Sequence, residues 1–174
     1  MKIQRITYLS LGTNQGDRIE NLQNAIQSID DHIGVVEKIS AIYKTPSWGF
    51  EGHDFFNICI EVTTHLLPEI LLSSLLEIEN KLGRVRSSNE GYENRKIDID
   101  ILLIADAVIF SKKLIVPHSK MLGRRFVMAP LAEIAPMMIH PIAKKQIALC
   151  LQNCDDTSEI SIINKKLQKP FPVS

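Results

Sequence analysis

The chain has 174 residues, of which 45% are hydrophobic and 23% are charged. This length and composition are typical of one globular domain with a buried core, so we expect a single domain spanning residues 1–174. Twenty basic residues balance twenty acidic ones, which excludes the strongly basic surface of a general nucleic-acid binder. Any anion that the chain binds must therefore meet a local cluster of positive charge.

The first third of the chain predicts a strand, a helix and a second strand. Arg5–Leu11 is a short β-rich run that ends in a loop at residues 12–16. Asp17, with Glu20 three residues later, predicts an N-cap and a capping box for a helix that ends at Gly34. The apolar face of this helix consists of Ile19, Leu22, Ile26 and Ile29. Val35–Tyr43 then predicts the second strand.

The middle of the chain predicts a third strand, a second helix and a fourth strand. Phe55–Thr63 alternates apolar and polar residues, as a strand does. Pro68 and Gly83 bound a helix, and residues 84–94 form a polar loop before a strand at Ile97–Ile104. The order β-α-β-β-α-β predicts an α+β, ferredoxin-like core, in which helices pack on one face of an antiparallel sheet.

Extra C-terminal elements are expected after this core. They are a short strand near Val108, a turn at Val116-Pro117-His118 and a helix over Phe126–Ile134. The segment from Pro141 to Ser174 carries no functional signal.

The sequence signals of location favour the cytoplasm. The segment after Met1 has no apolar core of a secretory signal, and no stretch is long enough to span a membrane. Cys59, Cys150 and Cys154 form no even framework and no C-x-x-C pair. Cys150 and Cys154 have a spacing that could contact a metal, but no nearby His or Cys pair completes a site, so free thiols in a reducing compartment are favoured.

Asp98 and Asp100 give the strongest chemical signal. On a strand their side chains share one face, about 6–7 Å apart, while Ile97, Ile99 and Ile101 point to the other. The strand continues with apolar residues, so we interpret it as a central strand of the sheet. Two carboxylates there require a compensating cation, and Mg²⁺ with phosphate or water ligands suits them. The alternative is an exposed strand that carries two solvated acids.

Cationic residues surround this pair in the sequence. Arginine side chains bind phosphate oxygens in a bidentate way, so a cluster of them here would bind the phosphate groups opposite the metal ion. For each arginine taken alone, a solvated loop position is the favoured interpretation. The cluster consists of Arg84, Arg86, Arg95, His118, Arg124 and Arg125.

Two further segments predict pocket walls. The loop at residues 12–16 precedes a helix but matches neither a P-loop nor a dinucleotide-binding pattern, which leaves it a structural loop or a wall of the pocket. Residues 45–57 combine rigid turn residues, aromatic rings and an amide, as a site for a flat heteroaromatic ligand does. Alternation makes Phe55 the stacking ring and Phe56 the core residue, although aromatic rings plugging a loop over the core remain an alternative.

Together these segments resemble the 6-hydroxymethyl-7,8-dihydropterin pyrophosphokinase family (2-amino-4-hydroxy-6-hydroxymethyldihydropteridine diphosphokinases) of folate biosynthesis. The resemblance covers Tyr8 to about Pro136, and its motifs are specific because they occur in order. They are residues 9–14, 43–46, 55–57, 79–86, 95–101, 116–118, 124–126 and 130–136.

The resemblance implies a ferredoxin-like fold, ATP as the diphosphate donor and two Mg²⁺ ions. By position, Asp98 and Asp100 match the metal-binding pair, and with Arg86 and Arg95 they form the expected catalytic group. The ATP-binding matches are Leu72, Glu79, Arg84, Arg86, Ile101, Lys113, His118 and Arg124. The pterin-binding matches are Thr45, Pro46, Trp48, Phe55, Asn57 and Phe126.

The implied reaction is in-line attack of the pterin hydroxymethyl oxygen on the β-phosphorus of ATP, which expels AMP. A role for Asp100 in deprotonating the hydroxyl stays open. The chain departs from the family pattern at Ser47, Trp48, Glu90, Tyr92 and Ser119, which bears on loop motion and nucleotide affinity more than on the reaction.

Two other functions compete with this interpretation. A ferredoxin-like RNA-binding module would need exposed aromatic residues on central strands and a basic surface. An inactive relative that serves as a scaffold would not need both aspartates and the arginines. We therefore expect a cytoplasmic enzyme, monomeric, with ATP and a pterin as its ligands and without nucleic acid or membrane partners.

Overall fold

The computed structural model describes residues 3–47, 53–83 and 96–170. Its strands are β1 (Arg5–Thr13), β2 (Gly34–Ile39), β3 (Ile42–Thr45), β4 (Phe55–Thr64), β5 (Asp98–Ile104), β6 (Ile109–Phe110), β7 (Ile115–Val116) and β8 (Ser161–Ile163). Its helices are α1 (Arg18–His32), α2 (Pro68–Lys81), the 3₁₀ turn η1 (Met121–Gly123), α3 (Arg125–Ile134) and α4 (Ile147–Gln152). None of the described helices is long and apolar enough to cross a membrane.

In the described part of the chain the main sheet has six strands in the order β5-β1-β4-β3-β8, and β2 also pairs with β4. Strand β1 is antiparallel to both β4 and β5. This arrangement confirms the predicted ferredoxin-like core, because two strand-helix-strand units interleave to place the first and third strands of the core at its centre.

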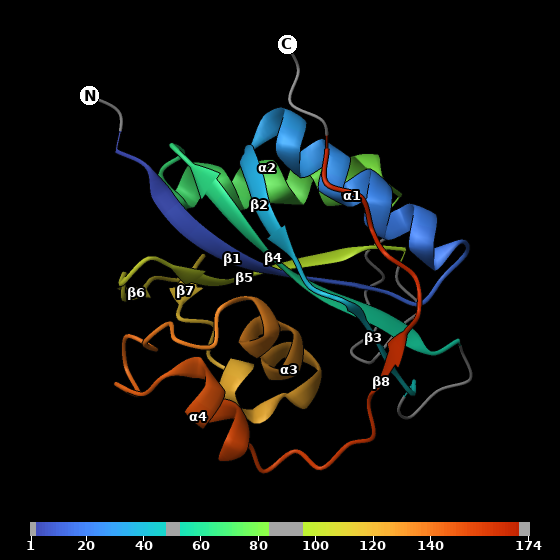
Figure 1. Ribbon diagram of the computed structural model, residues 1–174. Coiled ribbons are helices and arrows are strands. Elements are labelled where there is room, and N and C mark those ends of the chain that lie inside the picture. The colour runs from blue at the N-terminus through green and yellow to red at the C-terminus, as the bar shows by residue number, and fades with distance from the viewer. Residues whose placement is uncertain (1–2, 48–52, 84–95, 171–174) are drawn as a thin grey trace.

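Two apolar layers cover the two faces of the sheet (Figure 1). Helices α1 and α2 pack on one face against Leu9, Leu11, Ile58 and Ile60. Helix α3 packs on the other, in a layer with Tyr8, Cys59 and Leu103, and α4 packs against α3. We call the first the α1/α2 face and the second the α3 face. The two core helices thus share one face, as predicted, and the C-terminal helices cover part of the other.

The predicted helix ends are present. The Asp17 carboxylate accepts the Glu20 N–H at 3.0 Å and caps α1. Pro68 begins α2, and Gly83, with a φ of +89°, follows its end.

Three strand predictions needed correction. Strand β1 continues through Gly12 to Thr13, because both residues pair with β4. The predicted strand at Val35–Tyr43 is divided into β2 and β3 at Ser40 and Ala41. Strand β5 was expected to be central but lies at the end of the sheet order. Its apolar sequence is explained by cover on both faces, by α2 and by the α3 layer.

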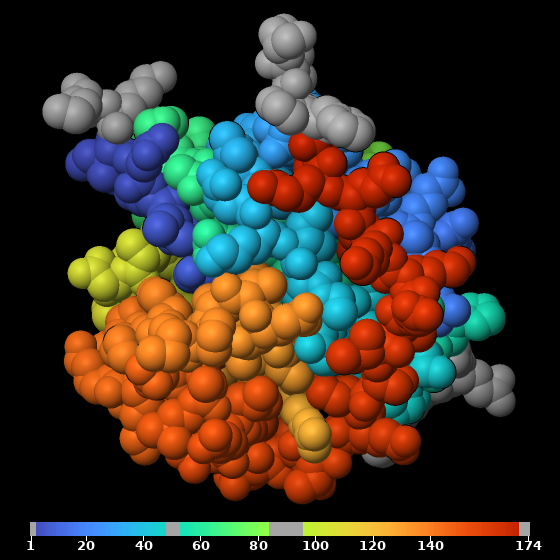
Figure 2. Space-filling view, viewed as in Figure 1, coloured from blue at the N-terminus to red at the C-terminus, as the bar shows by residue number. Residues whose placement is uncertain are grey.

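The C-terminal segment, without prediction from the sequence, extends the sheet. Strand β8 pairs with β3 from Ile42↔Ile163 to Lys44↔Ser161. Beyond it, Gln23 of α1 and the backbone of Gln168 exchange two hydrogen bonds of 2.8 and 2.9 Å. The segment therefore runs over the surface along β3 toward α1, as its red colour shows in Figure 2.

Candidate active site

The two predicted metal ligands lie on the α3 face of the sheet. Asp98 pairs with Gly12 of β1, and Asp100 pairs with Ser10. Both carboxylates are partly exposed, while Ile99 and Ile101 between and after them are buried in the α1/α2 layer. The alternation predicted from the sequence is therefore confirmed.

The residues expected to bind the pterin continue the same row across the sheet. Gly12, opposite Asp98, also pairs with Asn57 of β4, and Asn57 pairs with Tyr43 of β3. The Asn57 amide nitrogen donates to the Thr45 hydroxyl at 3.1 Å. A Cβ atom at Gly12 would lie 3.1 Å from the Asn57 amide oxygen. The glycine therefore leaves the sheet surface between the aspartates and Asn57 free of a side chain.

The two phenylalanines of the β4 motif divide as predicted. Phe55 pairs with Thr45 and is partly exposed, on the same face as Asn57. Phe56 is 7% exposed and packs in the α1/α2 layer, where the Arg18 guanidinium lies 3.9 Å from its ring centre. Phe126, the second expected stacking ring, is partly exposed in the first turn of α3, with the Arg124 guanidinium 5.7 Å from its ring centre.

His118 connects the aspartates with the cationic residues. Its pKa is lowered, first by burial and then by the nearby Arg124 and Lys120 charges, while Asp98 acts in the opposite direction. These effects require that Asp98, His118 and Arg124 lie close enough to interact. The structure therefore brings one predicted metal ligand together with two predicted phosphate-binding residues.

The donor set fits a magnesium ion better than a zinc ion. Within residues 3–47, 53–83 and 96–170, no group of three or more His, Cys, Asp and Glu side chains forms a metal cluster. Asp98 and Asp100 supply two carboxylates on one face, and Mg²⁺ characteristically takes one or two carboxylates and completes its shell with water and phosphate oxygens.

Some predicted ATP-binding residues lie elsewhere. The side chains of Leu72 and Ile101 pack in the α1/α2 layer, on the opposite face from the aspartates. Glu79 is 1% exposed, and its carboxylate accepts the Ile99 N–H at 2.7 Å, which braces β5 between the two aspartates. Lys113 is exposed in the turn between β6 and β7.

Four predicted site residues lie outside the described residues: Trp48, Arg84, Arg86 and Arg95. Pro46 is exposed directly after β3.

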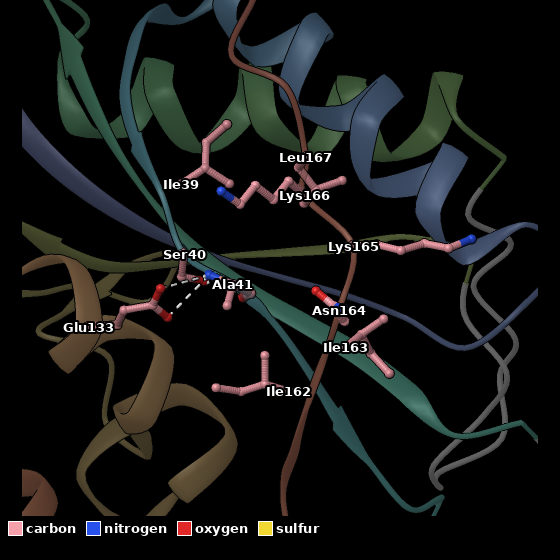
Figure 3. Close-up of a pocket in the computed structure, with 10 residues that line it drawn as sticks. All are labelled: Ile39, Ser40, Ala41, Glu133, Ile162, Ile163, Asn164, Lys165, Lys166 and Leu167. Atoms are coloured by element: carbon pink, nitrogen blue, oxygen red, sulfur yellow. Dashed lines mark hydrogen bonds between the residues drawn. The ribbon is translucent and has the colours of Figure 1, made fainter.

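Sequence reasoning missed Glu133 and Tyr43. The Glu133 carboxylate of α3 accepts the Ala41 N–H at 3.0 and 3.1 Å (Figure 3). It also accepts the Tyr43 hydroxyl at 2.8 Å. The carboxylate thereby takes the place of a strand partner for Ala41, which lies between β2 and β3. The pKa of the Tyr43 hydroxyl is raised by burial and by this hydrogen bond, so it remains a donor. Position 133 lies in the motif at 130–136, but nothing in the motif points to Tyr43.

A pocket of about 360 Å³ lies between this junction and residues 162–167 (Figure 3). None of the predicted site residues lines it. The residues expected to bind the substrates therefore do not share this pocket.

Comparisons with known proteins agree with this arrangement. Residues 8–136 match the model of the family described as 7,8-dihydro-6-hydroxymethylpterin-pyrophosphokinase (HPPK). The chain belongs to the HPPK family. The matched residues 8–136 contain Asp98, Asp100, Asn57 and Thr45, which share one face of the sheet.

Several relatives carry the name 2-amino-4-hydroxy-6-hydroxymethyldihydropteridine pyrophosphokinase. The Aquifex aeolicus protein is 43% identical over 141 residues, which cover 80% of this chain and 86% of the relative. The Porphyromonas gingivalis protein is 41% identical over 79% of this chain and 95% of its own length. The Bacillus subtilis protein is 43% identical over 76% of this chain and 79% of its own.

Solved structures show the same fold. An HPPK-DHPS structure in complex with substrates superimposes with a TM-score of 0.73 at 18% identity, over 87% of this chain and 43% of that one. Wild-type Plasmodium falciparum HPPK-DHPS gives a TM-score of 0.74 at 16% identity, over 88% of this chain and 45% of that one. The chain therefore spans less than half the length of these solved chains.

As an HPPK, the chain is an enzyme of folate biosynthesis. It transfers diphosphate from ATP to 6-hydroxymethyl-7,8-dihydropterin and releases AMP.

Proposed function

We propose that the α3 face is where this HPPK binds both substrates and that Asp98 and Asp100 hold its catalytic Mg²⁺, two ions in the complete site. The observation that supports this proposal is that Asp98, Gly12 and Asn57 pair across the neighbouring strands β5, β1 and β4. The metal-binding and the ring-binding residues therefore lie side by side on the sheet. When bound, Mg²⁺ supplies charge neutralisation for the phosphate oxygens.

The pterin is held by polar and aromatic side chains at the end of this row. Asn57 and Thr45, already joined by a hydrogen bond, offer an amide and a hydroxyl to the ring edge. Phe55 of β4 and Phe126 of α3 are the stacking rings on either side. The family resemblance assigns Pro46 and Trp48 to the same binding site, and Trp48 lies outside the described residues.

The triphosphate is held by hydrogen-bond donors. Arg124 contributes a positive charge and His118, whose lowered pKa leaves it neutral near pH 7, contributes a ring N–H; since both Arg124 and Asp98 lie near His118, these donors meet the phosphates on the side of the metal. The family resemblance adds Lys113 and, outside the described residues, Arg84, Arg86 and Arg95. Leu72, Glu79 and Ile101 lie toward the adenosine, and since the side chain of Ile101 is buried, its contact comes from the backbone of the end strand β5.

The reaction is an in-line displacement. The hydroxymethyl oxygen forms a bond to the β-phosphorus, the bond from that phosphorus to the α-β bridging oxygen breaks, and AMP leaves with the bridging electrons. The hydroxyl proton passes to solvent or to Asp100. The residues of the chain align the two substrates and stabilise the charge that develops on the phosphoryl oxygens.

We further propose that the enzyme acts as a monomer. A cytoplasmic location fits an ATP-consuming enzyme whose three cysteines are free.

Removal of one metal ligand tests the site. Asp98→Asn keeps the size of the side chain and removes its charge, and we expect AMP release to fall at least ~100-fold because the phosphate charge loses its counterion. The measurement is AMP formation from ATP, Mg²⁺ and the pterin alcohol. Asp106→Asn, at an exposed aspartate just after β5, is the control and keeps the wild-type rate. Equal rates in all three proteins would contradict the assignment.

A further inference from the structure

The first turn of α3 is stabilised from outside the helix. Arg124 occupies the N-cap position and makes no side-chain capping bond. An N-cap is normally Ser, Thr, Asp or Asn, whose oxygen accepts an N–H of the first turn, and a guanidinium has no acceptor. The helix nevertheless begins where an arginine is required for nucleotide binding.

Asp156 supplies the missing acceptor. Its Oδ2 atom accepts the Arg125 N–H at 2.8 Å, from 31 residues further along the chain. Its other carboxylate oxygen, Oδ1, accepts the Ser158 N–H at 2.9 Å and the Ser158 hydroxyl. The carboxylate is thus held by its own turn and directed at the helix.

The charge of Asp156 suits this role. Partial burial alone would raise its pKa, but the hydrogen bonds from Ser158 and Arg125, with the Arg125 charge, outweigh that effect and lower it. A carboxylate that stays ionised at a helix N-terminus also complements the helix dipole.

The residues on either side of the capped N–H are both site residues. Arg124, directly before it, is the phosphate-binding arginine, and Phe126, directly after it, is the stacking ring. Later in the same turn, Val127 and Met128 are 3% and 0% exposed, so the core anchors α3 from Val127 onward and the cap acts on the residues before it.

We propose that Asp156 is a positioning residue of the active site, which caps α3 in place of Arg124 and so holds Arg124 and Phe126 in their binding orientation. This rests on the proposed function of those two residues. Asp156 lies beyond residues 8–136, the part that matches the family, so the C-terminal segment of this chain contributes to a site that the family motifs do not reach.

The test compares two carboxylates that cap two helices. Asp156→Ala removes the cap of α3, and Asp17→Ala removes the equivalent cap of α1, on the opposite face of the sheet. Asp156→Asn keeps one acceptor oxygen in place of two and removes the charge, so it is the intermediate variant. Isothermal titration gives the Kd of each protein for the pterin alcohol and for a non-hydrolysable ATP analogue, and thermal unfolding gives the Tm.

We expect both alanine variants to lower the Tm by a similar amount. Only Asp156→Ala raises the two Kd values, by about fivefold, the factor that corresponds to the loss of one cap. Asp156→Asn raises both Kd values by less than Asp156→Ala does, and Asp17→Ala keeps both within about twofold of wild type.

Unchanged Kd values in Asp156→Ala would overturn the proposal and leave Asp156 a purely structural cap. An equal loss of binding in Asp156→Asn and Asp156→Ala would overturn the capping role as well. A folded wild-type chain that binds neither ligand would overturn the proposed function together with the role of Asp156, whereas binding without a difference between variants would overturn only the latter.

Discussion

Gly34 begins β2 at a point where no side chain fits. A Cβ atom there would lie 2.2 Å from the backbone oxygen of Thr63 on β4, far inside contact distance. The neighbouring Thr64 hydroxyl donates to the Ile33 carbonyl at 2.6 Å, which fixes the same corner. The glycine is therefore required by the close approach of two backbones, a reason that cannot be seen in the sequence, where Gly34 reads only as the end of a helix.

Gly34→Ala tests this contact. We expect a loss of about 3 kcal/mol in the free energy of unfolding, since backbone atoms of a paired strand must move apart. The measurement is urea unfolding followed by circular dichroism. Gly123→Ala is the matched control, because nothing lies within 4 Å of a Cβ at that position, and it stays within ~0.5 kcal/mol of wild type. Equal stability of the two variants would show that β2 tolerates the added methyl group.

At the scale of elements, local chemistry was enough to predict α1, α2 and β4. Asp17, Pro68 and Gly83 mark helix ends by interactions within a few residues, and the alternation in β4 separates Phe55 from Phe56. The break between β2 and β3 could not be predicted, because the carboxylate that replaces the strand partner of Ala41 comes from Glu133, 92 residues away. Likewise, β5 is apolar because both of its faces are buried, although it does not lie at the centre of the sheet.

His140 gives the turn before α4 a dependence on pH. It is 3% exposed, and its Nδ1 atom accepts the N–H groups of Ile142 and Ala143 at 3.2 and 3.0 Å. Burial lowers its pKa below the ordinary value of 6.5. The unfolded chain then binds the proton more readily, so the stability present above pH 6.5 is lost as the pH falls from there through the pKa of the folded state.

We therefore expect wild type to lose more stability than His140→Asn between pH 7.5 and pH 5, in urea unfolding at the two values. Asparagine offers an oxygen to the same two N–H groups and does not titrate. Parallel losses in the two proteins would mean that His140 is not responsible.

For the whole molecule, the sequence predicted the function more completely than it predicted the fold. The paired aspartates, the β4 motif and the arginine-rich turns identified the family, and the fold brings Asp98, Asn57 and Thr45 onto one face. The segment after residue 141 gave no signal, yet it adds β8 to the sheet and supplies the cap of α3 through Asp156. Those roles depend on contacts between distant residues, and single-sequence patterns do not encode such contacts.

The most direct test of the central claim is to identify both products of one turnover. Phosphorus NMR of the folded wild-type chain with ATP, Mg²⁺ and 6-hydroxymethyl-7,8-dihydropterin should show AMP and a pterin diphosphate ester in equal amounts, with neither formed when the pterin is left out. ADP with a pterin monophosphate would place the attack on the γ-phosphorus, and no turnover at all would contradict diphosphate transfer by this chain.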